Sequence, residues 1–230
     1  MPIAGAIALA VLAVAVLVAL QVRHVRHVRA QRGAVLDDVA PLFADAEITQ
    51  DGIGFPSLTG TYDGDRVKVE LVVDTLALRE LPRLWLVVTV FTEVAIAGPV
   101  DVLLRPRTAD IVSPGGRFAH EHAPPAGWPA DVRIATARPE PPPFAALEDA
   151  LPLLEDERTK ALTVTPRGVR VVQLLAKGQI GQYRVVRRAK FEAEVERAQL
   201  TAMIDAAVRI AHDVEVSAGL EKLLAGADPA

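Results

Sequence analysis

The residues best suited to metal chemistry are His120, Glu121 and His122. Imidazoles beside a carboxylate bind divalent ions, and an H-x-H pair on a strand would direct both rings to one face. A third ligand would have to come from far away, from Asp110 or His212. Because the pair stands in a stretch rich in proline and glycine, we expect a solvated loop and no bound metal, with His120 and His122 as the candidate ligands.

Motifs for phosphate binding and nucleophilic catalysis are missing. The sequence has no G-x-x-x-x-G-K-[ST], no G-x-G-x-x-G and no G-x-S-x-G elbow. Ser113, in a glycine-rich stretch, is a weak candidate nucleophile with no base near it in sequence. The lack of cysteine excludes thiolate catalysis and Cys-ligated metal sites. We therefore predict no catalytic residue and no cofactor.

A basic cluster, VRHVRHVR at residues 22–29, follows an uncharged N-terminal stretch. A period of three residues winds the arginines about halfway round a helix. That distribution suits a lipid headgroup layer, which surrounds a helix, better than a groove or a metal. We assign no ligand role to the two histidines in the cluster. The side chains assigned to the membrane interface are Arg23, Arg26, Arg29 and Arg32.

The stretch that precedes the cluster has the length of a membrane span. Residues 3–20 read IAGAIALAVLAVAVLVAL, and the uncharged run to Val22 makes a helix of about 30 Å. A cleaved signal peptide is the alternative, but no basic segment precedes the run and the run is long for a signal core. We predict a retained single-pass anchor. Small residues four apart either admit a second helix or reflect alanine-rich composition facing lipid: they are Ala4, Ala8, Ala15 and Ala19.

The charge distribution predicts topology and partners. Basic residues beside a span tend to stay cytoplasmic, so we expect the N-terminus outside and the main domain in the cytoplasm, at the inner membrane of a prokaryote. Beyond residue 33 the chain has 21 basic and 29 acidic residues, a net charge of −8. This acidic body disfavours nucleic acid as a partner. The basic run at residues 184–190 is accordingly interpreted as a salt-bridged sheet face.

The rest of the chain is typical of an α+β domain with mostly antiparallel sheet. A helical stripe at residues 36–43 is followed by a hairpin at Asp63-Gly64 and by a β-branched run at residues 83–96, which predicts a central strand. Residues 100–105 predict a further strand.

The second half of the sequence begins after a stretch rich in proline and glycine, which predicts a long loop with a short strand at 131–137. A helical stripe at residues 144–154 contains Pro152, which should kink or end it. A hairpin with its turn near Pro166, a strand at 181–191, a long amphipathic helix and a short last helix are expected to follow. The predicted segments are an anchor (1–22), a basic juxtamembrane segment (23–33), a first α+β half (34–106), the loop (107–143) and a second α+β half with C-terminal helices (144–230).

Two segments of the sequence are alike. Residues 36–47 read LDDVAPLFADAE and residues 147–158 read LEDALPLLEDER, and each precedes a predicted hairpin. An internal duplication of an α-β-β-β unit would explain this, and so would convergence of two amphipathic helices.

Function is predicted from these features together. We expect a membrane-anchored, non-enzymatic accessory, scaffold or assembly subunit, with the lipid bilayer and a membrane protein or a second copy as partners. The alternative is a membrane-tethered domain with a ligand cleft between its halves or under the C-terminal helix. A hydrolase is a third reading, and it would need polar groups that converge on Ser113, His120 or His122.

Overall fold

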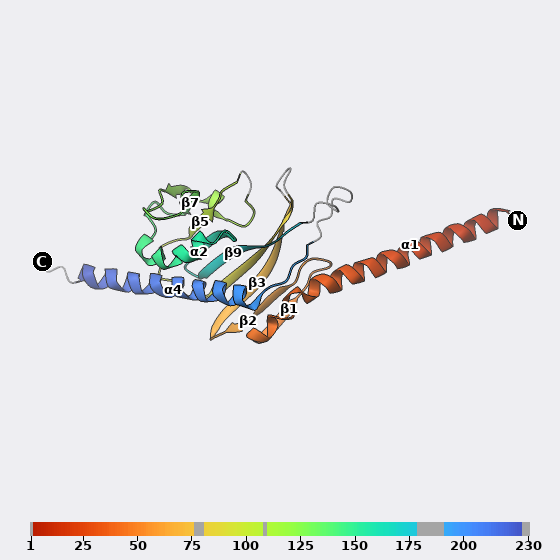
Figure 1. Ribbon diagram of the computed structural model, residues 1–230, viewed down its shortest axis with the longest axis horizontal. Helices are drawn as coiled ribbons and strands as arrows, with labels where there is room; N and C mark the ends of the chain where they lie inside the picture. The colour runs from red at the N-terminus through yellow and green to blue at the C-terminus, as the bar shows by residue number, and fades with distance from the viewer. Residues whose placement is uncertain (1, 76–80, 108–109, 179–190, 227–230) are drawn as a thin grey trace.

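The computed structural model describes residues 2–75, 81–107, 110–178 and 191–226. Within these ranges an apolar N-terminal helix leads into one antiparallel sheet of nine strands, and a long C-terminal helix lies across one face of the sheet (Figure 1). The predicted α+β class, with its N-terminal and C-terminal helices, is confirmed. The helices are α1 (Pro2–Gly33), α2 (Leu151–Glu155) and α4 (Arg197–Gly226), with 3-10 turns η1 (Ala34–Leu36), η2 (Ala40–Leu42), η3 (Gly115–Arg117) and η4 (Phe144–Ala150).

The strand order is β1-β2-β3-β4-β9-β8-β5-β7-β6, and every described pairing is antiparallel. Strands from both predicted halves of the sequence therefore share one sheet, and the two halves pair with each other at two places, β4 with β9 and β5 with β8. The strands are β1 (Ala44–Thr49), β2 (Ser57–Tyr62), β3 (Asp65–Asp74), β4 (Arg83–Phe91), β5 (Val100–Leu104), β6 (His120–His122), β7 (Val132–Thr136), β8 (Thr159–Thr165) and β9 (Gly168–Lys177).

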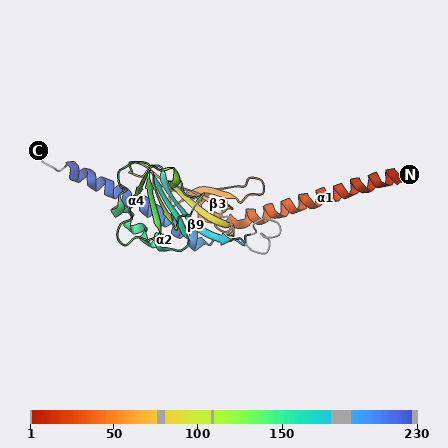
Figure 2. The same ribbon diagram turned by 90° about the horizontal axis from the view of Figure 1, so that it is seen from above.

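The main core lies between the sheet and α4 (Figure 2). The helix presents an apolar side on which residues recur three and four apart, as an amphipathic helix requires. Burying each large apolar side chain of this kind contributes roughly 1.5–3 kcal/mol. The buried residues of α4 include Leu200, Met203, Ile204, Ile210 and Val214.

A smaller core lies on the other face of the sheet. Trp85, Val87, Leu103 and Val172 form it, and Val112 covers it from the segment at residues 110–119. Both faces of β4 are consequently buried, with Leu84 through Val88 almost inaccessible to solvent, which confirms β4 as a central strand.

Several boundaries differ from the sequence predictions. The predicted stripe at 36–43 forms only 3-10 turns, and the two predicted C-terminal helices are one continuous helix, α4. Residues 107–143 contain two strands, β6 and β7, where one was expected. β1 was not predicted, although Ala44, Ala46 and Ile48 alternate with polar residues along it. Two of these three residues are alanine, which favours strands weakly, and all side chains of β1 are exposed. Most of the strand expected at 181–191 lies outside the described residues.

Candidate functional site

Helix α1 carries an apolar surface that the domain does not cover. Its large apolar side chains from Ile7 to Val22 have exposed fractions between 44 and 68%. Within the described residues it is the helix long and apolar enough to cross a membrane. Ala8, Ala15 and Ala19 are exposed on it; Ala4 lies in the same helix, but its side chain is outside the described set.

The last turns of α1 are joined directly to the sheet. The Arg32 guanidinium lies over the Phe55 ring, 4.9 Å from its centroid, and Arg32 Nη1 donates to the Ile53 carbonyl at 2.7 Å. Gln50 Nε2 donates to the Arg29 carbonyl at 3.1 Å. These contacts hold the turn between β1 and β2, residues 50–55, against the end of α1. The helix therefore enters the domain with no intervening linker.

The four arginines assigned to the membrane interface fall into two environments. Arg23, Arg26 and Arg29 are exposed on α1, as a headgroup contact needs. Arg32 is half-buried against the turn between β1 and β2, and this burial lowers the pKa of its guanidinium. Arg32 thus contributes to the junction with the domain.

A fully buried carboxylate, Asp101, lies on β5 beneath the segment at residues 110–119. Its Oδ1 accepts from Thr163 Oγ1 at 2.8 Å and its Oδ2 from Ser113 Oγ at 2.5 Å. The Gly115 backbone N–H and the charge of Arg133 also favour the ionised form, yet burial outweighs them and raises the pKa of Asp101. The hydrogen bonds join the segment to the face of the sheet that α4 does not cover.

Gly115 is required for this approach. A Cβ added there would lie 2.3 Å from Asp101 Oδ2, far inside contact distance. Ser113, the weak nucleophile candidate, donates a hydrogen bond to Asp101, so its hydroxyl helps to hold the segment at residues 110–119 on the sheet. No described imidazole contacts Ser113 by a hydrogen bond, so the relay that activates a serine in hydrolases is not assembled in the described part of the chain.

Lys160 attaches the start of the same segment. Its side chain is 3% exposed, and its ammonium forms an ion pair with Asp110 Oδ1 at 2.8 Å and donates to the carbonyls of Leu104 and Arg105 at 3.1 and 2.8 Å. Burial lowers the pKa of Lys160, and the Asp110 carboxylate opposes this shift. Asp110, a candidate third metal ligand from the sequence, is thus engaged by a buried cation.

The His120 and His122 pair lies on the edge strand β6, which corrects the expectation of a loop. The prediction failed because β6 is three residues long and is defined by pairing with β7, a contact that local composition does not reveal. Thr136 Oγ1 donates to the Arg138 carbonyl and accepts a hydrogen bond from His122 Nε2 at 2.7 Å. Over the described ranges, no three His, Asp or Glu side chains group closely enough to hold a metal.

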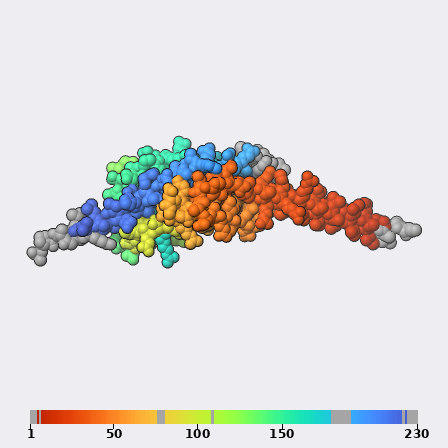
Figure 3. Space-filling view, turned by 90° about the horizontal axis from the view of Figure 1, so that it is seen from below, coloured from red at the N-terminus to blue at the C-terminus, as the bar shows by residue number. Residues whose placement is uncertain are grey.

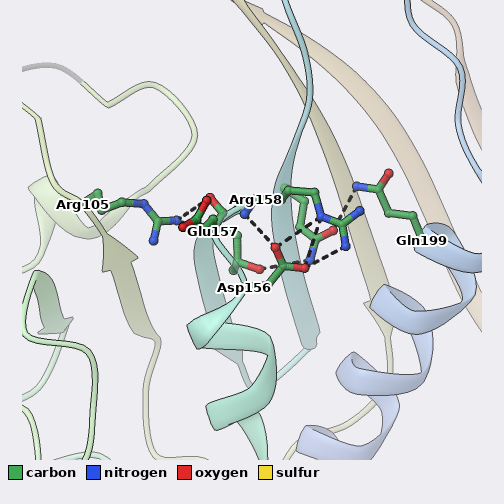
Figure 4. Close-up of polar contacts among 7 residues, drawn as sticks. Arg105, Asp156, Glu157, Arg158 and Gln199 are labelled. Atoms are coloured by element: carbon green, nitrogen blue, oxygen red, sulfur yellow. Dashed lines mark hydrogen bonds and ion pairs between the residues drawn. The ribbon is translucent and has the colours of Figure 1, made fainter.

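A cleft of about 360 Å³, lined by both polar and apolar side chains, lies between the start of α4 and the β8–β9 end of the sheet. Figure 4 shows Arg158 beside Asp156, with Gln199 reaching in from α4. Arg158 Nη2 donates to Asp156 Oδ2 at 2.9 Å, and this contact lowers the pKa of Asp156 and raises that of Arg158. Gln199 donates to Gln173, which donates to Thr159, each at 3.0 Å.

The polar groups of this cleft are largely bonded to one another. Behind them, the apolar side chains of α4 fill the space against the sheet. The arrangement fastens the start of α4 to β8 and β9. A second cavity, of about 420 Å³, lies beside Val214 and Ala218 of α4. The ligand cleft expected under the C-terminal helix stays a prediction.

Sequence reasoning did not single out Asp101, Lys160 or Gln173. Asp101 is the one polar residue in the otherwise apolar β5, and that interruption is a signal in the sequence. Lys160 and Gln173 lie in strands that carry other polar residues, so the sequence does not set them apart. The basic residues at 184–190 lie outside the described part of the chain.

Comparison of the chain with models of known protein families, with curated proteins and with solved structures finds no match. The functional assignment accordingly rests on the physical features of the site.

Burial of Asp101 predicts a pH-dependent contribution to stability. Because its folded-state pKa is raised, the folded state binds the proton more tightly than the unfolded state, and stability falls as pH rises from the ordinary carboxyl value, 3.8, through the folded pKa. Asp101→Asn removes this dependence, so the variant gains stability relative to the native protein as pH rises. Urea unfolding in detergent across that pH range measures it. Asp131→Asn, at an exposed aspartate, is the control, and parallel curves for the native protein and Asp101→Asn would contradict the expectation.

The Arg32 contacts predict a rigid junction. Arg32→Lys keeps the charge but loses the planar group that stacks on Phe55 while bonding Ile53. Spin labels at Gln21→Cys and Ile111→Cys should give a narrow distance distribution in the native background and a broad one in Arg32→Lys, by double electron–electron resonance. Arg29→Lys, at an exposed arginine, should leave the distribution narrow. Equal widths in all three would show that Arg32 does not fix the helix.

Proposed function

We propose that this chain is a single-pass membrane protein whose α+β domain is a non-enzymatic accessory, scaffold or assembly subunit of a membrane complex. The observation that carries the proposal is the exposed apolar surface of α1 from Ile7 to Val22. This surface lies within the uncharged stretch from Ile3 to Val22, which is about 30 Å long as a helix. Such a stretch is stable in the hydrocarbon core of a bilayer and unfavourable in water.

The proposed location is the inner membrane of a prokaryote, with the N-terminus outside and the domain in the cytoplasm. The exposed positions of Arg23, Arg26 and Arg29 at one end of the apolar stretch support this orientation, because basic residues beside a span tend to remain cytoplasmic.

The accessory role is supported by two uncovered surfaces at opposite ends of the molecule. One is the apolar surface of α1, where small residues permit close packing of a second helix. The other is the end of α4, which projects from the domain (Figure 3). There Val216, Leu220 and Leu223 recur four and three apart, with exposed fractions of 56, 58 and 72%. Such a stripe on an otherwise folded domain is typical of a protein contact.

We also propose that the two halves arose by internal duplication. Aligned positions of residues 36–43 and 147–154 have the same burial: Leu36 and Leu147 are buried, as are Phe43 and Leu154. The hairpins β2–β3 and β8–β9 follow these segments and flank β4 on either side. If the halves are duplicated, β1 is an insertion in the first half. Different backbone paths for the two units in an experimental structure would contradict it.

The anchoring proposal predicts a specific extraction and labelling pattern. The full chain should resist alkaline carbonate and dissolve in detergent. A chain with Leu9, Leu12 and Leu17 changed to Gln should be released, because each change places an amide in the span. With the single cysteine Ile111→Cys, an impermeant maleimide should label lysed but not intact cells. Labelling of intact cells would reverse the orientation.

The accessory role predicts a companion protein. Purification in mild detergent from the native host should recover a membrane protein in fixed ratio with the chain. The double variant Leu220→Ser/Leu223→Ser should lose that companion, because it makes the exposed stripe of α4 polar, while Ile111→Ser should retain it. Recovery of the native chain as a lone monomer would contradict the role.

A further inference from the structure

The domain begins very close to the end of the apolar stretch of α1. Val25, Val28 and Arg32 are half-buried, while the other side chains between residues 23 and 31 are exposed. The three positions lie within about 60° of one another round the helix. One side of α1 is therefore partly covered from Val25 onward, and Arg32 identifies that side as the one facing the turn between β1 and β2.

The helical rise gives the depth of this contact. Val25 lies three residues past Val22, about 4.5 Å along the helix, and Arg29 lies about 10 Å past it. The headgroup layer on each side of the hydrocarbon core is roughly 5–8 Å thick. With α1 across the bilayer, the turn that bonds the Arg29 carbonyl through Gln50 lies at the outer boundary of the headgroups. An ordinary helix tilt of about 20° would bring one side of the domain into them.

The chemistry of the turn fits that depth. Ile53 is 47% exposed at the turn, although its carbonyl is held by Arg32. Phe55 contacts both the Arg32 guanidinium and the Phe191 ring, whose centroid is 6.1 Å from that of Phe55. An exposed apolar side chain, Ile53, next to the aromatic ring of Phe55 and to arginines is suited to the boundary between headgroups and water.

We infer that the turn at residues 50–55 is a second bilayer contact, in which Ile53 enters the headgroup layer while Arg23, Arg26 and Arg29 attract anionic phospholipid headgroups. This inference rests on the proposed membrane anchoring and deepens it. The contact fixes the sheet in one orientation above the bilayer, because α1 and the turn are bonded to each other and both meet the same surface.

The lack of native cysteine allows a direct test on the full chain. Ile53→Cys is labelled with an environment-sensitive fluorophore and reconstituted in phosphatidylcholine vesicles that carry a spin label on the headgroup. Ile111→Cys is the matched control: this residue is 41% exposed and precedes Val112, which packs in the smaller core formed by residues of β4, β5, β8 and β9. Quenching should be about twofold stronger or more at position 53, because quenching by a headgroup label falls off within the thickness of that layer.

Adding anionic lipid tests the contact of the three arginines separately from the contact of Ile53. Added phosphatidylglycerol should increase quenching at position 53, and the Arg23→Gln/Arg26→Gln/Arg29→Gln variant should lose that increase. Equal quenching at positions 53 and 111 in protein that floats with the vesicles after carbonate treatment would overturn the second contact and leave the anchor intact. Protein that fails to float would overturn the anchor itself.

Discussion

The antiparallel pairing of β4 with β9 is the constraint on which the rest of the structure depends. It joins a strand of the first half to a strand of the second over a register that runs from Arg83 opposite Lys177 to Val90 opposite Val169. Both strands are apolar on both faces, so their pairing is stable only if each face is covered. α4 covers one face, and Val112 covers part of the other.

Buried polar groups complete this covering where apolar side chains are scarce. Asp101 and Lys160 both hold the segment at residues 110–119 on the sheet, and both are bonded at nearly every polar atom. Removing one partner would leave a buried charge uncompensated, which costs more than an ordinary hydrogen bond. These polar groups therefore determine where the segment lies.

A small number of contacts also fixes how α1 joins the domain. The hydrogen bonds of Arg32 and Gln50 orient the helix because they join its last two turns to the turn between β1 and β2. If α1 spans a membrane, as proposed, its tilt is transmitted to the sheet because the helix enters the domain without a linker. In that proposed arrangement the projecting end of α4 lies away from the bilayer, and its exposed stripe is the proposed contact for a partner.

The sequence by itself determined the elements whose signal is local. The uncharged run of α1, the alternation in β3, the β-branched run of β4 and the helical period of α4 all follow from side-chain spacing, and all four are present. The lack of catalytic motifs likewise led to a membrane and partner role as the proposal.

Only the tertiary structure decided which distant residues meet. β1 and β6 form because neighbouring strands supply their hydrogen bonds. β6 has only three residues, and the apolar positions of β1 are mostly alanine, so neither gives a strong strand signal in the sequence. Arg32 looked like one of four equivalent interface arginines, but the turn between β1 and β2 gave it a bonded position that Arg29, one turn earlier, does not share. Asp101 and Ser113 meet because folding brings β5 beneath a later segment, and burial of a charge has its energetic effect only once the chain has closed around it.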